Sequence, residues 1–135
     1  MRYLTDANAL SEPTKPAPER KVVEWLAANE GELVVDSIIL GELYTGILAL
    51  PRGRRRARLE RWFETVVETL DCLPWDDATS RRWAALVVDL KRRGETIPLL
   101  DSMIAATALF HRLIVVTRNT RDFSRTGVRT LNPFE

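Results

Sequence analysis

The stretch Leu113-Ile114-Val115-Val116-Thr117 decides the fold. It is an almost continuous apolar run rich in β-branched residues, and its length suits a β-strand. A strand that is apolar at successive positions, rather than at alternate ones, is typical of a sheet covered on both faces, as parallel sheets are. The run therefore predicts a central strand of a parallel sheet.

Outward from this strand, strand-like and helix-like segments alternate along the chain. Further strands are predicted at 3–6, 33–35, 72–75 and 128–131. Helices are predicted between Pro18 and Gly31 and at 37–50, 59–70, 76–93 and 101–112. Such alternation indicates βαβ units. We therefore expect an α/β fold, a sandwich with a central parallel β-sheet flanked by helices on both faces, whose ligands bind beyond the carboxyl ends of the strands.

Length and composition limit the class of protein. The chain has 135 residues, the size of one domain, so we expect a single domain over residues 1–135. With one cysteine the chain cannot form an internal disulfide framework, and with one cysteine and one histidine it has too few such ligands for a Cys- or His-rich metal site. Cys72 itself is expected in the core. The absence of a long apolar run and of a signal-like N-terminus favours a cytoplasmic protein without a membrane segment.

The net charge of +1 conceals two arginine-rich segments. Residues 52–61 hold six arginines and one glutamate, and residues 112–129 hold five arginines and one aspartate. The first segment has two interpretations: a solvated helix start, or a contact with phosphate groups or a partner protein, and the forked guanidinium suits contacts to phosphate. The candidate contact residues are Arg54, Arg55, Arg56, Arg118 and Arg121.

Four carboxylates lie in apolar surroundings, namely Asp6, Glu42, Asp101 and Asp122. Three of them are close to strand ends or helix starts, so the parallel sheet should bring them to one edge. Ionised carboxylates gathered there repel one another and are costly to bury. A divalent cation with oxygen ligands would resolve both problems, and Mg²⁺, or Mn²⁺ as a substitute, suits such ligands.

Each acid also has a structural interpretation. Asp101 could be a helix N-cap, Glu42 could pair with an arginine, and Asp122 could be a turn or cap residue. Asp36 serves as a comparison, because it follows a strand and precedes Ser37, and we interpret it as a cap rather than a ligand.

Several segments carry a family resemblance. They are LTDAN (4–8), SIILGEL (37–43), DSMIAATA (101–108), VTRNTRDF (116–123) and the closing NPFE (132–135). In this order they resemble a PIN-domain ribonuclease of the VapC toxin type, in the FitB-like branch. The resemblance covers essentially the whole chain.

The resemblance implies a Mg²⁺-dependent endoribonuclease that cleaves RNA by metal-activated water. It further implies the toxin of a type II toxin–antitoxin pair, silenced by a small cognate antitoxin, and a homodimer. By motif, Asp6, Glu42 and Asp101 match the acidic triad of the family. Many relatives carry an acid at the position of Asn119, so Asn119 is a candidate neutral ligand or water-binding residue and Asp122 the better carboxylate candidate.

Asn8 and Thr117 are expected to form hydrogen bonds with the metal-ligating residues and so to orient them. Ala7 stands where a threonine is common in the family, which would weaken the support of Asp6. Ala7 and Asn119 together motivate an alternative: a catalytically weak PIN-like module that binds antitoxin or RNA.

Overall fold

The computed structural model describes residues 2–135, which contain one five-stranded parallel sheet with strand order β3-β2-β1-β4-β5. The strands are β1 (Tyr3–Thr5), β2 (Leu33–Asp36), β3 (Asp71–Leu73), β4 (Ile114–Val116) and β5 (Arg129–Leu131). All five predicted strands are present, and every residue of β2 and β4 is buried. The prediction of a parallel sheet buried on both faces is confirmed.

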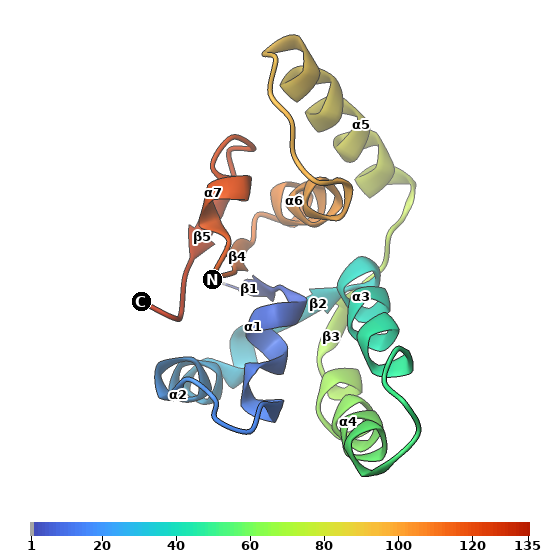
Figure 1. Ribbon diagram of the computed structural model, residues 1–135. Helices are drawn as coiled ribbons and strands as arrows, with labels where there is room; N and C mark the ends of the chain where they lie inside the picture. The colour runs from blue at the N-terminus through green and yellow to red at the C-terminus, as the bar shows by residue number, and fades with distance from the viewer. Residues whose placement is uncertain (1) are drawn as a thin grey trace.

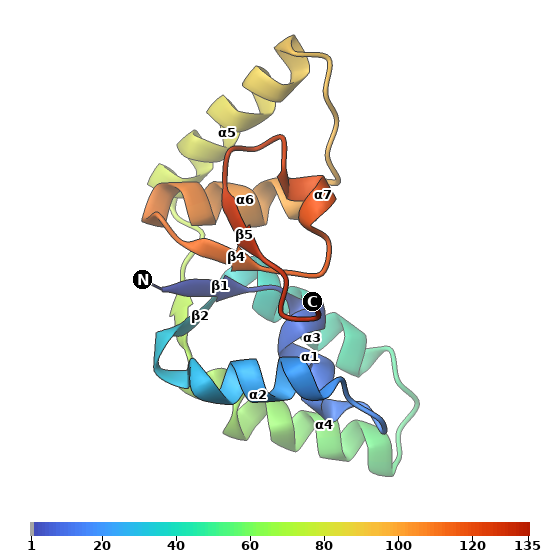
Figure 2. The same ribbon diagram turned by 90° about the vertical axis from the view of Figure 1, so that its left-hand side faces the viewer.

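Helices cover both faces of the sheet (Figures 1 and 2). The α-helices are α1 (Ala7–Ser11), α2 (Arg20–Ala28), α3 (Ser37–Leu48), α4 (Arg54–Thr65), α5 (Asp77–Arg92), α6 (Leu99–His111) and α7 (Thr120–Phe123). Short 3-10 turns are η1 (Glu12–Thr14), η2 (Glu30–Glu32) and η3 (Val67–Thr69). Helix α6, with α5 outside it, lies on one side of the sheet, and α1, α2 and α4 lie on the other. Helix α3 contacts α1, α4 and α6.

Four helices differ from the predictions. Helices α1 and α7 were not predicted, because their five and four residues are too few to show a helical repeat. Helix α4 begins at Arg54 rather than at residue 59, so the arginine run is helical. Helix α6 begins at Leu99 with Pro98 at its N-cap, so the interpretation of Asp101 as the cap is wrong.

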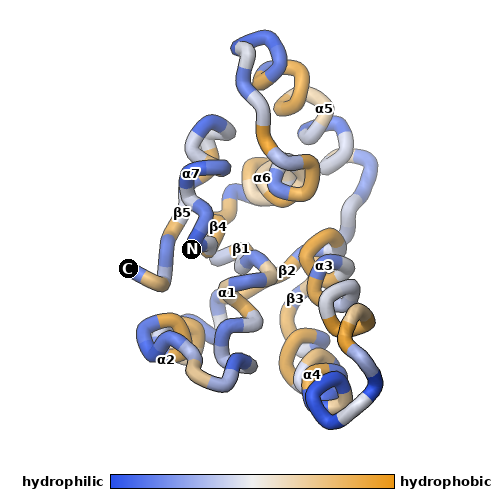
Figure 3. The backbone as a smooth tube through the Cα atoms, viewed as in Figure 1, coloured by the Kyte–Doolittle hydropathy of each residue, from blue (hydrophilic) through white to orange (hydrophobic). Residues whose placement is uncertain are grey.

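The core lies between the sheet and the inner faces of the helices. Leu4, Val34, Val35 and Val115 are fully buried, and Ile104 of α6 packs against the same cluster. Figure 3 shows apolar residues along the strands and α6, whereas the start of α4 is strongly hydrophilic. Cys72 is exposed, which corrects the expectation of a core residue, because β3 is an edge strand that pairs only with β2. Within residues 2–135, no helix combines the length and the apolar character needed to cross a bilayer.

Candidate active site

Asp6 is positioned at the carboxyl end of β1, where it caps α1. Its Oδ1 accepts a hydrogen bond of 2.8 Å from the Ala9 N–H, and its own N–H donates to the Val116 carbonyl of β4. Burial raises the pKa of the Asp6 carboxyl, and hydrogen bonds from the Thr117 hydroxyl and the Ala9 N–H partly offset the increase. Thr117, which is fully buried, therefore contacts Asp6 directly.

Glu42 projects from α3 toward the same edge of the sheet. Its side chain reaches solvent, yet partial burial raises the pKa of its carboxyl, and the charges of Asp6, Asp101 and Asp36 raise it further. Within residues 2–135 no arginine or lysine forms an ion pair with Glu42. The alternative of a structural Glu–Arg pair is therefore wrong for the described chain.

Asp101 is the most strongly perturbed of the four acids. It lies in the first turn of α6. Burial, the charge of Asp122, a hydrogen bond shared with Asp122 and the charge of Asp6 raise the pKa of its carboxyl to about 6. An acid whose pKa is raised by neighbouring acids stands in an excess of negative charge.

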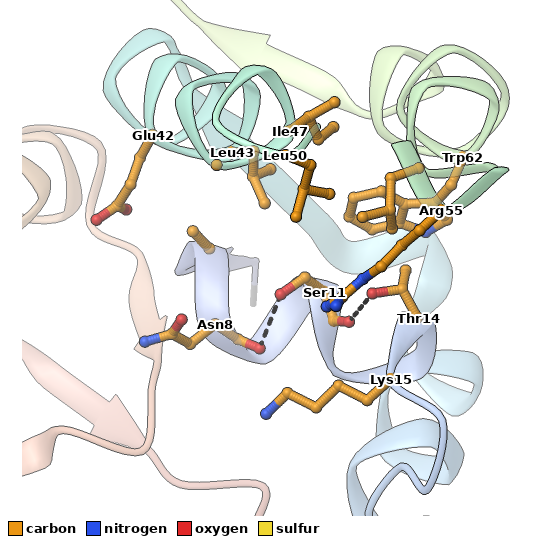
Figure 4. A pocket seen from close by; sticks show the side chains of 13 residues that line it. Asn8, Ser11, Thr14, Lys15, Glu42, Leu43, Ile47, Leu50, Arg55 and Trp62 are labelled. Atoms are coloured by element: carbon orange, nitrogen blue, oxygen red, sulfur yellow. Dashed lines mark hydrogen bonds between the residues drawn. The ribbon is translucent and has the colours of Figure 1, made fainter. Parts of the chain in front are cut away.

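Asp122 and Asn119 come from the segment that follows β4. The Asn119 side-chain amide donates to Asp122 Oδ2, and the Asn119 backbone N–H donates to Thr117 Oγ1 over 2.9 Å. Asn119 thus orients Asp122, which faces Asp101. The Thr117 hydroxyl forms hydrogen bonds with both Asn119 and Asp6. Asn8 is exposed on α1, and Figure 4 shows its side chain directed to the same side as that of Glu42.

The four acids influence one another but do not form a closed ligand shell as they stand. Asp101 is coupled to Asp122 and Asp6, and Glu42 is coupled to Asp6 and Asp101. Across residues 2–135, however, no three His, Cys, Asp or Glu side chains lie close enough together to hold one ion. The four candidate ligands are all carboxylates, and none of them forms an ion pair with a cation in the described chain. Such a set of oxygen ligands fits a hard divalent ion. Binding one would require the carboxylates to turn toward each other.

Asp36 behaves as the expected cap. It is 2% exposed, and its Oδ1 accepts a hydrogen bond of 2.8 Å from Ile39 N–H at the start of α3. Burial raises the pKa of its carboxyl, and the hydrogen bond from the Ile39 N–H partly offsets the increase.

Sequence reasoning missed a fifth acid in apolar surroundings, Glu12 of η1. Its Oε2 accepts from the Glu19 N–H at 2.9 Å, and its Oε1 forms an ion pair with Lys15 Nζ at 2.8 Å. The hydrogen bond with Lys15 lowers the pKa of Glu12, and the Glu19 N–H and the charge of Arg118 act in the same direction. Pro13, Pro16 and Pro18 follow it and are typical of a loop, and a loop sequence gives no sign that a glutamate will be buried.

The five candidate contact arginines lie in different surroundings. Arg55 lines a cavity that begins at Asn8 and Glu42. Arg56 is engaged with the Glu60 carboxylate at 3.1 Å and the Leu50 carbonyl at 3.4 Å. The Arg118 guanidinium lies 3.8 Å from the centre of the Phe134 ring. Arg54 and Arg121 are exposed on α4 and α7. Of the five candidate arginines, Arg55 is the one that lines a cavity together with Glu42.

Comparison with known proteins agrees with this arrangement. The model of the PIN domain family matches residues 3–128. A VapC ribonuclease of Sinorhizobium fredii is 37% identical over 134 residues, 96% of each chain, and the toxin FitB of Neisseria gonorrhoeae is 34% identical over 97% of each. The crystal structure of FitAcB from the same organism superposes with a TM-score of 0.91 at 32% identity, covering 98% of this chain and 99% of that one. The resemblance to VapC and FitB-like toxins and the predicted fold class are thereby confirmed.

The proximity of the acids predicts that the free energy of unfolding depends on pH. Because the folded-state pKa of Asp101, about 6, exceeds its unfolded value, the folded protein binds more protons between the two values. The stability of the metal-free protein should therefore fall as the pH rises from about 4 to about 7. Asp101→Asn should raise the free energy of unfolding near pH 7 by about 1 kcal/mol, allowing for solvent screening, and flatten the pH dependence.

Urea denaturation in EDTA at about pH 5 and pH 7 measures this effect. Asp89→Asn is the control, because Asp89 is an exposed acid on α5 paired only with Arg93, and it should change stability by no more than about 0.5 kcal/mol. A variant Asp101→Asn that is less stable than the wild type near pH 7 would contradict the electrostatic account.

Proposed function

The chain belongs to the PIN-domain family, and from this premise we propose that it is a Mg²⁺-dependent endoribonuclease acting as the toxin of a type II toxin–antitoxin pair. Relatives with the names VapC ribonuclease and tRNA(fMet)-specific endonuclease VapC support a nuclease, the second being a protein of Shigella flexneri that is 30% identical over 94% of this chain. Mn²⁺ is the expected substitute ion.

The observation that carries the proposal is the group of mutually repelling carboxylates Asp6, Glu42, Asp101 and Asp122. These four residues would hold the ion. A divalent ion there would supply an activated water and offset the negative charge that develops on the phosphate.

The surrounding residues prepare the site without taking part in the reaction. Ala9 N–H and the Thr117 hydroxyl donate to the Asp6 carboxylate and stabilise its charged form. The Asn119 amide fixes Asp122 against Asp101. Asn8, on the exposed side of α1, is placed to contact substrate or a water molecule.

Cleavage of RNA tests the catalytic role of the acids. Asp6→Asn should lower the rate at least about a hundredfold, because it removes a charge while asparagine still caps α1. Asp36→Asn is the matched control: it also replaces a buried cap that follows a strand, and it should cleave within a few-fold of the wild type.

Chelation with EDTA should abolish cleavage by the wild type, and Mn²⁺ binding measured by calorimetry should be lost in Asp6→Asn but retained in Asp36→Asn. Cleavage that persists in EDTA would refute the proposal. A wild-type protein that binds RNA or antitoxin but does not turn over with Mg²⁺ or Mn²⁺ would support the weak binding module instead.

The fourth acidic position can be tested separately. We assign it to Asp122, because after burial Asp122 has the largest effect on the pKa of Asp101, ahead of Asp6, whereas Asn119 acts on Asp122. Asp122→Asn should therefore weaken Mn²⁺ affinity by about tenfold or more, and Asn119→Ala, which removes only the supporting amide, by a smaller factor. The reverse order would place Asn119 in the ligand set.

We further propose a cognate antitoxin and a homodimer as partners. Crystal structures of relatives, including FitAB bound to a DNA fragment, contain toxin–antitoxin complexes. Exposed apolar side chains on this chain, such as Leu48 on α3 and Leu99 on α6, support contacts with other chains. Light scattering of the purified protein should give twice the chain mass, and co-expression with the antitoxin should relieve growth inhibition. A monomeric mass would refute the dimer.

A further inference from the structure

A cavity of about 280 Å³ adjoins the acidic site, between α1, α3 and α4 (Figure 4). Asn8 and Glu42 stand at one end, and Arg55 and Trp62 stand at the other. Apolar side chains line the part between them, among them Leu43, Ile47, Leu50 and Leu59. The cavity therefore begins at a proposed metal ligand and ends at a cation and an aromatic ring.

Arg55 is the cation of α4 that enters this cavity. Figure 4 shows its side chain extending from α4 across the cavity toward Ser11 and Thr14. No carboxylate within residues 2–135 pairs with it, whereas its neighbour Arg56 is engaged with Glu60 and the Leu50 carbonyl. A guanidinium without an acidic partner, held over a cavity, is available for forked hydrogen bonds to a phosphate.

Lys15 adds a second cation to the cavity wall. Its ammonium is fixed by the buried Glu12 carboxylate at 2.8 Å, and that carboxylate is fixed in turn by the Glu19 N–H. Arg118 acts more weakly on the same carboxylate. The ion pair with Glu12 thus places Lys15 at the cavity wall.

We propose that this cavity binds the nucleotide next to the scissile phosphodiester, with Arg55 on its phosphate, Lys15 as a second phosphate contact, and the base against Trp62. The assignment rests on the proposed function, since it takes the scissile phosphate to lie at the acids. The volume is close to the lower end of small-ligand pockets, about 300 Å³, and suits one nucleotide of a single strand rather than a duplex. An aromatic ring beside a cationic wall is the arrangement by which single strands are held.

Binding of a short fluorescein-labelled single-stranded RNA, measured by anisotropy in EDTA, tests the proposal without cleavage. Arg55→Ala should weaken binding about tenfold and reduce the slope of log affinity against log salt by about 0.7, the loss of one phosphate contact. Arg61→Ala removes the same charge from the same helix at an exposed position outside the cavity. It should change the affinity less than about twofold.

Trp62 gives a second readout. RNA binding should quench tryptophan emission in the wild type, and Trp62→Phe should lose most of the quenching. In cleavage assays Arg55→Ala should raise KM more than it lowers kcat, because the residue binds a flanking nucleotide and does not touch the reacting atoms. Unchanged thermal melting of Arg55→Ala would confirm that these effects are not caused by unfolding.

Equal losses of RNA affinity in Arg55→Ala and Arg61→Ala would overturn the subsite. Unchanged RNA affinity in Arg55→Ala, together with weaker binding of the cognate antitoxin, would overturn it in favour of a protein-binding groove. If the wild type binds RNA through Arg55 and Trp62 but does not cleave it, the proposed function fails while the nucleotide site stands. If it cleaves RNA without dependence on Arg55, only the subsite fails.

Discussion

Mutual repulsion between carboxylates at one edge of the sheet is the constraint on which the rest of the site depends. Parallel strands end at the same edge, so Asp6 after β1 and the Asn119–Asp122 turn after β4 are neighbours by topology. Helices α3 and α6 bring Glu42 and Asp101 to that edge. Hydrogen bonds to the carboxylates stabilise their charged form, and Asp6 accepts them from the Ala9 N–H and the Thr117 hydroxyl, while Asp122 accepts one from the Asn119 amide.

Asp6 and Asp36 show how one local motif serves two purposes. Each follows a strand, caps the next helix through one oxygen at 2.8 Å, and has a pKa raised by burial. They differ in what lies around them. Asp36 is almost completely buried, with Thr107 of α6 beside it, whereas Asp6 is only partly buried and its charge acts on both Glu42 and Asp101. Placement among other acids, and not the cap itself, distinguishes a candidate ligand from a structural residue.

The strands and the four acids could be predicted because both have local signatures: β-branched runs for the strands, and carboxylates out of place in apolar sequence. Helix α1 and the start of α4 could not. Before Leu59 the helix has one small apolar residue, Ala57, which is too little to mark a helical face, although arginine is a good helix former and Arg54 begins the helix. The exposure of Cys72 and the burial of Glu12 could not be predicted for a related reason. Whether a strand lies at an edge, or a turn buries a glutamate against Lys15, depends on neighbours remote in sequence.

The net charge of +1 is a sum of opposite charges that the fold places in different regions. The acids occupy the carboxyl edge, while Lys15 and Arg55 flank it on one side and Arg118, stacked on Phe134, acts on the same Glu12 that holds Lys15. Beyond about 10 Å, the Debye length at 0.1 M salt, these opposite charges largely cancel. A strand of RNA would therefore gain little from long-range attraction, and its register over the acids would depend on short contacts. Single side chains that reach into the cavity, above all Arg55, would then control where the RNA strand lies.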